Sequence, residues 1–398
     1  MRLTRRTRIS AYTATLLIAL AALYVAKNWV MLARHFSHPG DLLETPVQWY
    51  RPTEIVPGST GSPFPAARGR DLTISYDALK SAMDYAKSQG SHALIVARHG
   101  RIELEKYWFD TDRSTKVNSG SMASTLLALL VGAAVADGYI QSVDDPLSRY
   151  LPELAGDERR DIRLRDALEM TSGLDALAPS SSLLSKFVRH YMGTDFQYRL
   201  LELDAGLPGA FQYNTSNVDL LGIVLERAVG RRYADYLSTQ IWIPIGAQEA
   251  NMYLDREGGF VLPSCCVFAT AMDWLKVGQL ILNKGRTEGV QVISEEWIDR
   301  MLEPSTQFPA FGRLIWRGVG SPESEETAGS NSSSCGHNKE AFVNEDLVYL
   351  CGEGYQRVYI VPSLYLVIVR IGGSQGGWPP DWEESRLPNI IAEGTDVP

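Results

Sequence analysis

The sequence predicts an α+β fold with one antiparallel sheet whose strands come from both ends of the chain. Two hairpin patterns predict it: residues 93–97 turn back into residues 102–107, and residues 357–361 turn back into residues 366–370. The residues between these hairpins show mostly helical spacing. We therefore expect helices to flank the sheet, a mainly helical insertion, and a functional site at the seam between the two parts.

Three stretches of the insertion carry apolar residues at helical spacing, and a glycine soon after each one favours a helix end there. They are residues 126–136, 218–229 and 274–282.

The composition is that of an ordinary globular protein, with 45% hydrophobic and 21% charged residues among 398. It excludes a disordered or collagen-like chain. The net charge of −9, without a long run of Lys and Arg after the first few residues, argues against a nucleic-acid partner. The six histidines show no H-x-x-x-H or H-E-x-x-H spacing and no C-x-x-C pair occurs, so we expect neither a metal nor another cofactor.

The N-terminal segment, residues 1–37, carries a membrane signal. Arginines at positions 2, 5, 6 and 8 precede an apolar run at residues 9–26, a pattern that keeps the basic end in the cytoplasm. Ala19-Leu20-Ala21 would suit a signal peptidase, but it lies inside the apolar run. We therefore favour an inner-membrane anchor with the domain facing the periplasm, and secretion after cleavage is the alternative.

Behind this segment we expect a linker and one domain. Residues 38–69 are rich in Pro, Gly, Ser and Thr and show no periodicity, so they are expected to lie along the surface as a linker. Residues 70–398 form the predicted domain, with residues 70–118 and 335–398 in its α/β part and residues 119–334 in its mainly helical part.

The four cysteines leave two alternatives open. Cys335 and Cys351 could form a disulfide in an oxidising compartment, or both could remain buried thiols. The adjacent Cys265 and Cys266 fit core packing better than chemistry.

One serine motif in the sequence does not predict a catalytic site. Gly372–Gly376 matches G-x-S-x-G around Ser374 and follows a predicted strand. Pro379 and Pro380 follow in place of a helix, however, and no histidine lies downstream. The Ser, acid, His order of an α/β-hydrolase therefore cannot be completed.

A second serine stands at the start of the apolar helix, within Asn118–Ser124. Unpaired N–H groups and the helix dipole favour developing negative charge there, so Ser121 could be a nucleophile whose own N–H helps to bind an oxyanion. The simpler local interpretation is a helix N-cap, for which Ser119, Ser121 and Ser124 compete.

Six segments, taken in order, resemble serine β-lactamase-related hydrolases, in the branch that contains class C β-lactamases, esterases and 6-aminohexanoate-dimer hydrolases. The segments are Ser121–Ile140, Ser142–Leu154, Ile162–Leu174, Phe211–Gly222, Phe268–Leu280 and Cys351–Gln356. The resemblance implies a β-lactamase/transpeptidase-like fold and a small ester, amide or peptide-like substrate.

The resemblance also implies residue roles. Ser121 matches the acylated nucleophile of the S-x-x-K motif, and Tyr213 matches the tyrosine that takes the serine proton and returns it to the leaving group. The segment from Gly352 to Gly354 would border the acyl pocket and supply an N–H to the oxyanion hole.

Three positions depart from the family pattern. Ser124 stands where the motif lysine belongs, and a neutral hydroxyl cannot hold a tyrosine as phenolate. Thr215 replaces the usual Asn or Ser after the tyrosine, and Tyr355 replaces the glycine of the Gly-Gln pair, leaving Gln356 in place. Tyr355 could fill the pocket with its ring.

Two hypotheses follow. The chain is an exported serine hydrolase that cleaves an ester or amide through an acyl-enzyme at Ser121. Alternatively, it is a catalytically impaired pseudoenzyme of the same fold that serves as a ligand-binding or interaction domain of the cell envelope.

Overall fold

The computed structural model describes residues 5–38, 45, 47–61, 64–177, 180–319, 335–336, 338–373 and 382–395. The G-x-S-x-G serine, Ser374, and the prolines that follow it lie outside the described residues.

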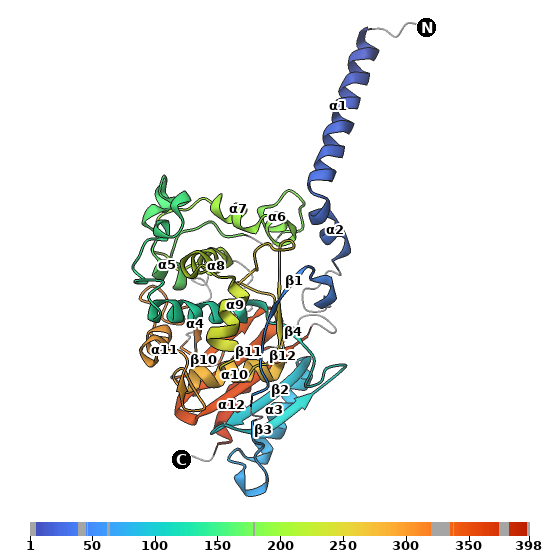
Figure 1. Cartoon of the computed structure of the whole chain (residues 1–398). Coiled ribbons are helices and arrows are strands. Elements are labelled where there is room, and N and C mark those ends of the chain that lie inside the picture. The colour runs from blue at the N-terminus through green and yellow to red at the C-terminus, as the bar shows by residue number, and fades with distance from the viewer. Residues whose placement is uncertain are drawn as a thin grey trace.

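The main sheet has six antiparallel strands in the order β3-β2-β12-β11-β10-β9 (Figure 1). Their bounds are β2 Ser91–Arg98, β3 Arg101–Tyr107, β9 Trp316–Arg317, β10 Val348–Gly352, β11 Gln356–Val361 and β12 Leu366–Gly372. Both predicted hairpins are present, as β2–β3 and β11–β12. Antiparallel pairing from Leu366↔Arg98 to Ile371↔Ala93 joins them, so the sheet does unite the two ends of the chain.

Helices cover both faces of this sheet. On one face, α3 Tyr76–Ser88 packs on β2 and on α12 Arg386–Glu393. On the other, α10 Ala271–Leu282 lies across β2, β11 and β12. A Cβ on Gly278 would lie 2.6 Å from Val367 and 2.7 Å from Val358, so the glycine lets α10 approach the strands closely.

The insertion is mainly helical, as predicted. Its elements are η3 Gly120–Met122, α4 Ala123–Ala136, α5 Leu164–Leu168, α6 Lys186–Met192, α7 Phe196–Leu201, α8 Thr215–Val229, α9 Tyr233–Leu237 and α11 Glu295–Leu302. Helix α8 begins three residues before the predicted start because Asn214 caps it by accepting from Ser216 N–H. Helix α10 likewise begins at a capping box between Thr270 and Asp273. Polar caps thus extend helices beyond their apolar spacing.

The segment expected to be a surface linker contributes a strand instead. Within residues 38–69, β1 Thr53–Val56 pairs with β5 Ala250–Tyr253, in a second sheet completed by β6 Val267–Ala269 and β4 Val117–Asn118. Tyr50 and Val56 are buried. The strand is only four residues long and Pro and Gly flank it, so no alternating pattern revealed it.

Both cysteine pairs are disulfides. Cys335 bonds to Cys351 across a Cα–Cα distance of 6.0 Å, which settles the alternative left open by the sequence. Cys265 bonds to its neighbour Cys266, which corrects the expectation of simple core packing. The second bond links two consecutive residues just before β6.

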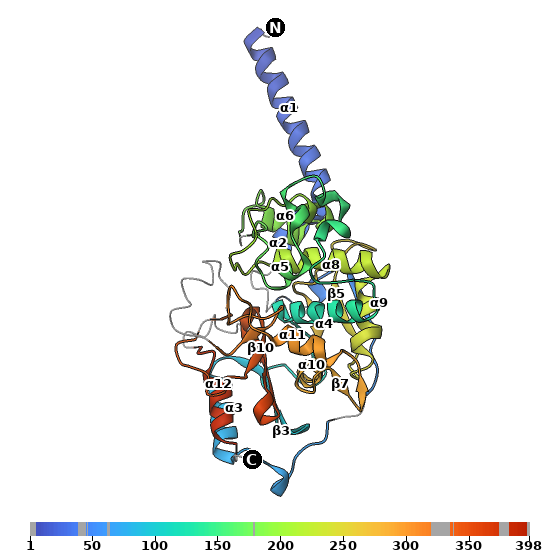
Figure 2. The ribbon, with the colours of Figure 1, turned by 90° about the vertical axis from the view of Figure 1, so that its left-hand side faces the viewer.

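The N-terminus forms two helices, α1 Arg5–Lys27 and α2 Trp29–Ser37, that are bent by 74° (Figures 1 and 2). Among the described residues, no single helix is both long and apolar enough to cross a membrane. The pair Tyr12–Lys27 and Trp29–Ser37 together meets that test by length and composition.

A buried ion pair connects the sheet to the segment before α12. Arg357 donates to both carboxylate oxygens of Glu384 at 2.6 Å, and both side chains are fully buried. Removing one partner of a buried pair typically costs about 3–5 kcal/mol because the other charge is left unpaired. We therefore expect Glu384→Gln to lower the free energy of unfolding by about that amount in urea titrations followed by circular dichroism.

Glu153→Gln provides the matched control, because Glu153 pairs with Arg227 through the same two-oxygen geometry on the surface. It should change the unfolding midpoint little. Equal effects of the two substitutions would show that the buried pair does not support the sheet.

Candidate active site

Ser121 lies in a tight turn that runs directly into the buried helix α4. The turn is fixed from both sides: Ser119 N–H donates to the carbonyl of Val267, Val267 N–H donates to Ser119 Oγ, and Asn118 Oδ1 accepts from Gly120 N–H. Neither η3 nor α4 has a side-chain cap bond. The N-cap interpretation of this serine cluster is therefore not supported, and the half-buried Ser121 side chain is left for other contacts.

The turn rests against the end of β10, backbone against backbone. A Cβ built on Gly120 would lie 2.6 Å from the backbone nitrogen of Glu353, and one built on Gly352 would lie 2.2 Å from the carbonyl oxygen of Ser119. Real Cβ atoms do not approach this closely. Glycine at both positions therefore permits the contact that brings Ser121 next to the Gly352–Gly354 segment, as the sequence predicts.

Tyr213 meets Ser121 from the other side. It immediately precedes the Asn214 cap of α8, and its phenol lies close enough to the Ser121 side chain for the serine to lower the phenol's pKa. Its ring packs against Trp316 at 5.5 Å between centroids. The structure therefore joins the two residues that the sequence assigns to chemistry, although 92 positions separate them in the chain (213 − 121).

The surroundings favour the neutral form of Tyr213. Burial raises the pKa of the phenol above its ordinary value, and the charge of Glu353 acts in the same direction. The Ser121 side chain and the charge of Arg357 oppose this rise without cancelling it. The Arg357 guanidinium is paired with Glu384, so its positive charge is largely neutralised by that carboxylate.

Ser124 occupies the third position after Ser121, one turn farther along the same helix. It is buried, and its hydroxyl has no hydrogen-bond partner among the described residues. The neighbouring Thr125 differs, because its hydroxyl donates to the Leu314 carbonyl at 2.8 Å. The position of the expected cation therefore holds a neutral, unpartnered hydroxyl.

Thr215 is coupled to a tyrosine that the sequence analysis missed. Its Oγ1 lies 3.3 Å from the phenol oxygen of Tyr191 in α6. Burial raises the pKa of Tyr191, which also lies close enough to Tyr213 for the two phenols to interact electrostatically. Helix α6 is only seven residues long and carries no motif, so nothing in the sequence marked Tyr191.

Arg357, Arg370 and Gln356 shape the turn from Gly352 to Gln356, and Arg357 donates to the Gly352 carbonyl at 3.0 Å. Gly354 and Tyr355 both have left-handed backbone conformations, with φ of 73° and 57°. Arg370 donates to the carbonyls of both residues, at 2.9 and 2.7 Å, and Gln356 bonds twice to the Gly372 backbone. The Tyr355 ring packs against Trp382, with 5.3 Å between centroids.

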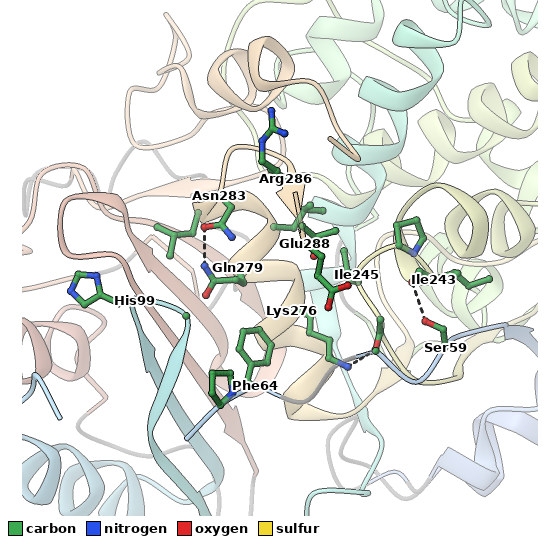
Figure 3. A pocket seen from close by; sticks show the side chains of 18 of the residues that line it. Ser59, Phe64, His99, Ile243, Ile245, Lys276, Gln279, Asn283, Arg286 and Glu288 are labelled. Carbon is green, nitrogen blue, oxygen red and sulfur yellow. Dashed lines mark hydrogen bonds between the residues drawn. The ribbon is translucent and has the colours of Figure 1, made fainter. Parts of the chain in front are cut away.

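A cavity of about 520 Å³ lies away from this cluster, between α10, the β2–β3 turn and the β7–β8 hairpin (Arg286–Thr287 and Val290–Gln291) (Figure 3). Lys276 lines it, but its ammonium donates to the Gly246 carbonyl and pairs with Asp273 at 3.6 Å. Neither Ser121 nor Tyr213 borders the cavity. We therefore place the candidate chemistry at the Ser121–Tyr213 contact.

The unpartnered hydroxyl of Ser124 predicts an unusual response to substitution. Ser124→Ala should leave the free energy of unfolding unchanged or raise it by about 1 kcal/mol, because it removes a desolvated hydroxyl and improves helix propensity. Thr125→Val is the control and should lower it by about 1 kcal/mol, because the Leu314 carbonyl loses its donor. Urea unfolding measures both, and an equal loss at both positions would reveal a partner for Ser124.

Residues 80–313 match the Beta-lactamase family. The 6-aminohexanoate-dimer hydrolase of Paenarthrobacter ureafaciens is 26% identical over 63% of this chain and 67% of its own length. Penicillin-binding protein 4* of Bacillus subtilis (strain 168) is 25% identical over 42% of this chain, which spans only 37% of that relative. The class C β-lactamase of Rhodobacter sphaeroides shares the fold, with a TM-score of 0.57 at 18% identity over 80% of this chain and 99% of that one. Because the family match covers more than half of the sequence, the chain belongs to the Beta-lactamase family of serine β-lactamase-related hydrolases.

Proposed function

We propose that this protein is a serine hydrolase of the cell envelope that cleaves a small ester, amide or peptide-like substrate through an acyl-enzyme at Ser121. The approach of the Tyr213 phenol to the Ser121 side chain, which brings a nucleophile and a base together, carries the proposal. The two residues meet next to a helix N-terminus and a strand end, where backbone N–H groups can stabilise an oxyanion.

The proposed reaction has two halves. Tyr213, as phenolate, takes the Ser121 proton while the serine oxygen bonds to the substrate carbonyl carbon. The carbonyl oxygen becomes an oxyanion, held by the Ser121 N–H and by an N–H of the Gly352–Gly354 segment. Tyr213 then returns the proton to the leaving alcohol or amine as its bond breaks. Water repeats the sequence on the acyl-enzyme and releases a carboxylic acid.

The rate of this reaction is limited by the absent cation. A half-buried phenol with a raised pKa is a phenolate only rarely at neutral pH, and Ser124 adds no positive charge. The same observation favours the second candidate function, a pseudoenzyme that binds its ligand beside Ser121 and Tyr213 without turnover.

Envelope localisation is part of the proposal. The apolar run at residues 9–26 lies within α1, after its first arginines, and at 1.5 Å per residue it corresponds to about 27 Å, close to the bilayer core of about 30 Å. Two disulfides are consistent with an oxidising compartment outside the cytoplasm. We therefore place the domain on the periplasmic side of an inner membrane, tethered by α1, with secretion after cleavage as the alternative.

A fluorophosphonate probe tests the proposed nucleophile. We expect the full-length protein to be labelled slowly at Ser121, and mass spectrometry of tryptic peptides will locate the adduct. Ser121→Ala should abolish labelling, and Tyr213→Phe should slow it about 100-fold or more, because general-base help of this kind contributes about 10²–10⁴. A folded wild-type protein that gains no adduct would exclude the hydrolase in favour of the pseudoenzyme.

The raised pKa of Tyr213 fixes the shape of the pH profile. The reactive form is the phenolate, so a raised pKa shifts the rise in labelling rate toward alkaline pH. We expect the rate to climb about tenfold per pH unit from pH 7 upward, without a plateau below about pH 10. Circular dichroism at each pH controls for unfolding. A plateau near neutral pH would identify a different base.

A further inference from the structure

Helix α2 is firmly attached to the folded domain through one buried arginine. The guanidinium of Arg34 donates to five backbone carbonyls: Gly193 at 2.8 Å, Arg51 at 2.9 Å, Asp255 at 2.9 Å, Met192 at 3.2 Å and Leu254 at 3.5 Å. It also lies 5.2 Å from the centre of the Tyr253 ring. Four of the acceptors lie more than 150 residues away in the chain. The domain is therefore held in one orientation relative to α2 and is not attached to it by a flexible linker.

Because of this attachment, one particular end of the domain faces the direction in which α1 leaves it. Figures 1 and 2 both show α1 leaving the domain at the end where α2 and α6 pack together, with its far end pointing away from the main sheet. If α1 crosses a bilayer, the end of the domain that carries α6 and α7 comes to the bilayer surface.

That end exposes large apolar side chains. On α2, Trp29 is 65% and Phe36 75% exposed, and beside α6 and α7 the exposed side chains are Leu184 at 69%, Tyr198 at 62% and Leu207 at 90%. The run Gly206–Ala210 is exposed throughout and has no charged residue. Lys186 pairs with Asp175 at 3.2 Å and with Asp204 at 3.7 Å, which brings the neighbourhoods of Leu184 and Leu207 together. We call these five side chains the apolar end surface.

We propose that the apolar end surface rests in the interfacial layer of the membrane from which α1 emerges. The inference depends on the anchor included in the proposed function. Trp and Tyr favour the membrane–water interface, and apolar side chains of surface-bound elements reach about 5–10 Å into it. A flexible tether would let this face turn outward. The Arg34 contacts hold α2 on the domain, and backbone bonds join α2 to α1: Asn28 N–H donates to the Tyr24 carbonyl, and Leu32 N–H donates to the Asn28 carbonyl. Exposure of this surface to lipid therefore follows from continuity with α1.

The charges of this surface indicate a lipid contact that is apolar in character. Lys186, Arg189 and Arg199 are offset by acidic neighbours at Asp175, Asp195, Glu202 and Asp204. Such a balanced surface has little preference for anionic headgroups. Zwitterionic phosphatidylcholine should therefore suffice, and added salt should not release the contact.

The contact would bring the lipid surface near the candidate site. Residues 208–212 lead from Leu207 to Tyr213, and this segment is fixed to the domain by bonds from Gly209 N–H to the Thr171 carbonyl and from Gln212 N–H to the Met170 carbonyl. A substrate held at the membrane surface would therefore approach the candidate site from its Tyr213 side.

Single added cysteines test the proposal, because all four native cysteines are in disulfides. Leu184→Cys and Leu207→Cys report on the apolar end surface. Val290→Cys is the matched control, since Val290 is an apolar residue that is 62% exposed on β8, whose partner β7 lies far from α1 in Figure 2. The full-length variants are placed in phosphatidylcholine nanodiscs, and maleimide-polyethylene glycol labelling is timed relative to the same protein in urea.

We expect labelling at positions 184 and 207 to be at least tenfold slower than at position 290, and 0.5 M NaCl to leave that ratio unchanged. Lipids with a nitroxide on the acyl chain should quench a fluorophore at position 207 but not at position 290. Equal labelling rates, or equal quenching, would overturn the proposal. Protection in native membranes without protection in pure lipid would also overturn it, by assigning the surface to a protein partner.

The anchor itself is tested separately by flotation with vesicles after alkaline carbonate extraction. A chain that fails to float contradicts the anchor, and with it the proposed localisation. A chain that floats but shows equal labelling contradicts only the docking of the apolar end surface.

Discussion

The contact between two backbones, at Gly120 and Gly352, is the constraint on which the candidate site depends. Neither position has room for a Cβ, so the turn before α4 lies directly on the end of β10. This contact joins the helical insertion to the sheet at the residue where β10 ends. Ser121 follows Gly120 immediately, and its position relative to the strand end is therefore set by main chain rather than by flexible side chains.

The sheet end is held in turn by buried charge. Arg357 donates to the Gly352 carbonyl as well as to Glu384, and Arg370 donates to the next carbonyls of the turn. These bonds stabilise a turn that contains two left-handed residues. The same bonds pair the positive charges of Arg357 and Arg370 with groups that hold the structure together. The site thus has well-ordered geometry and weak electrostatic support for a phenolate, so the proposed reaction would be slow even though the fold is intact.

Much of this architecture could be predicted from local patterns. Apolar and polar residues alternate in the strands of both hairpins, and the apolar run after Ser121 is long enough to indicate a helix. These patterns were sufficient to predict the α+β fold and the seam between its two parts. The pairing of Ser121 with Tyr213 came only from the order of six family-like segments, because no local pattern relates two residues so far apart in the chain.

Other features could not be predicted because their cause is tertiary. Strand β1 is four residues long and is stabilised by pairing with β5, and Tyr191 enters the site only through the packing of a short helix on α8. In the sequence, nothing distinguishes Arg34 from the other basic residues beside the apolar run. Its role depends on carbonyls that come from three distant segments. The bond between Cys265 and Cys266 also has no signature beyond adjacency.

We infer that a missing cation at Ser124 limits an otherwise assembled site. Ser124→Lys tests this most directly, with Ser124→Met as an uncharged control that also fills the space. Loss of one preorganised group typically costs about 2.7–4 kcal/mol in the transition state. We therefore predict that the lysine variant hydrolyses an aryl ester about 100-fold or more faster than wild type, while the methionine variant does not. A folded lysine variant with unchanged activity would contradict the account.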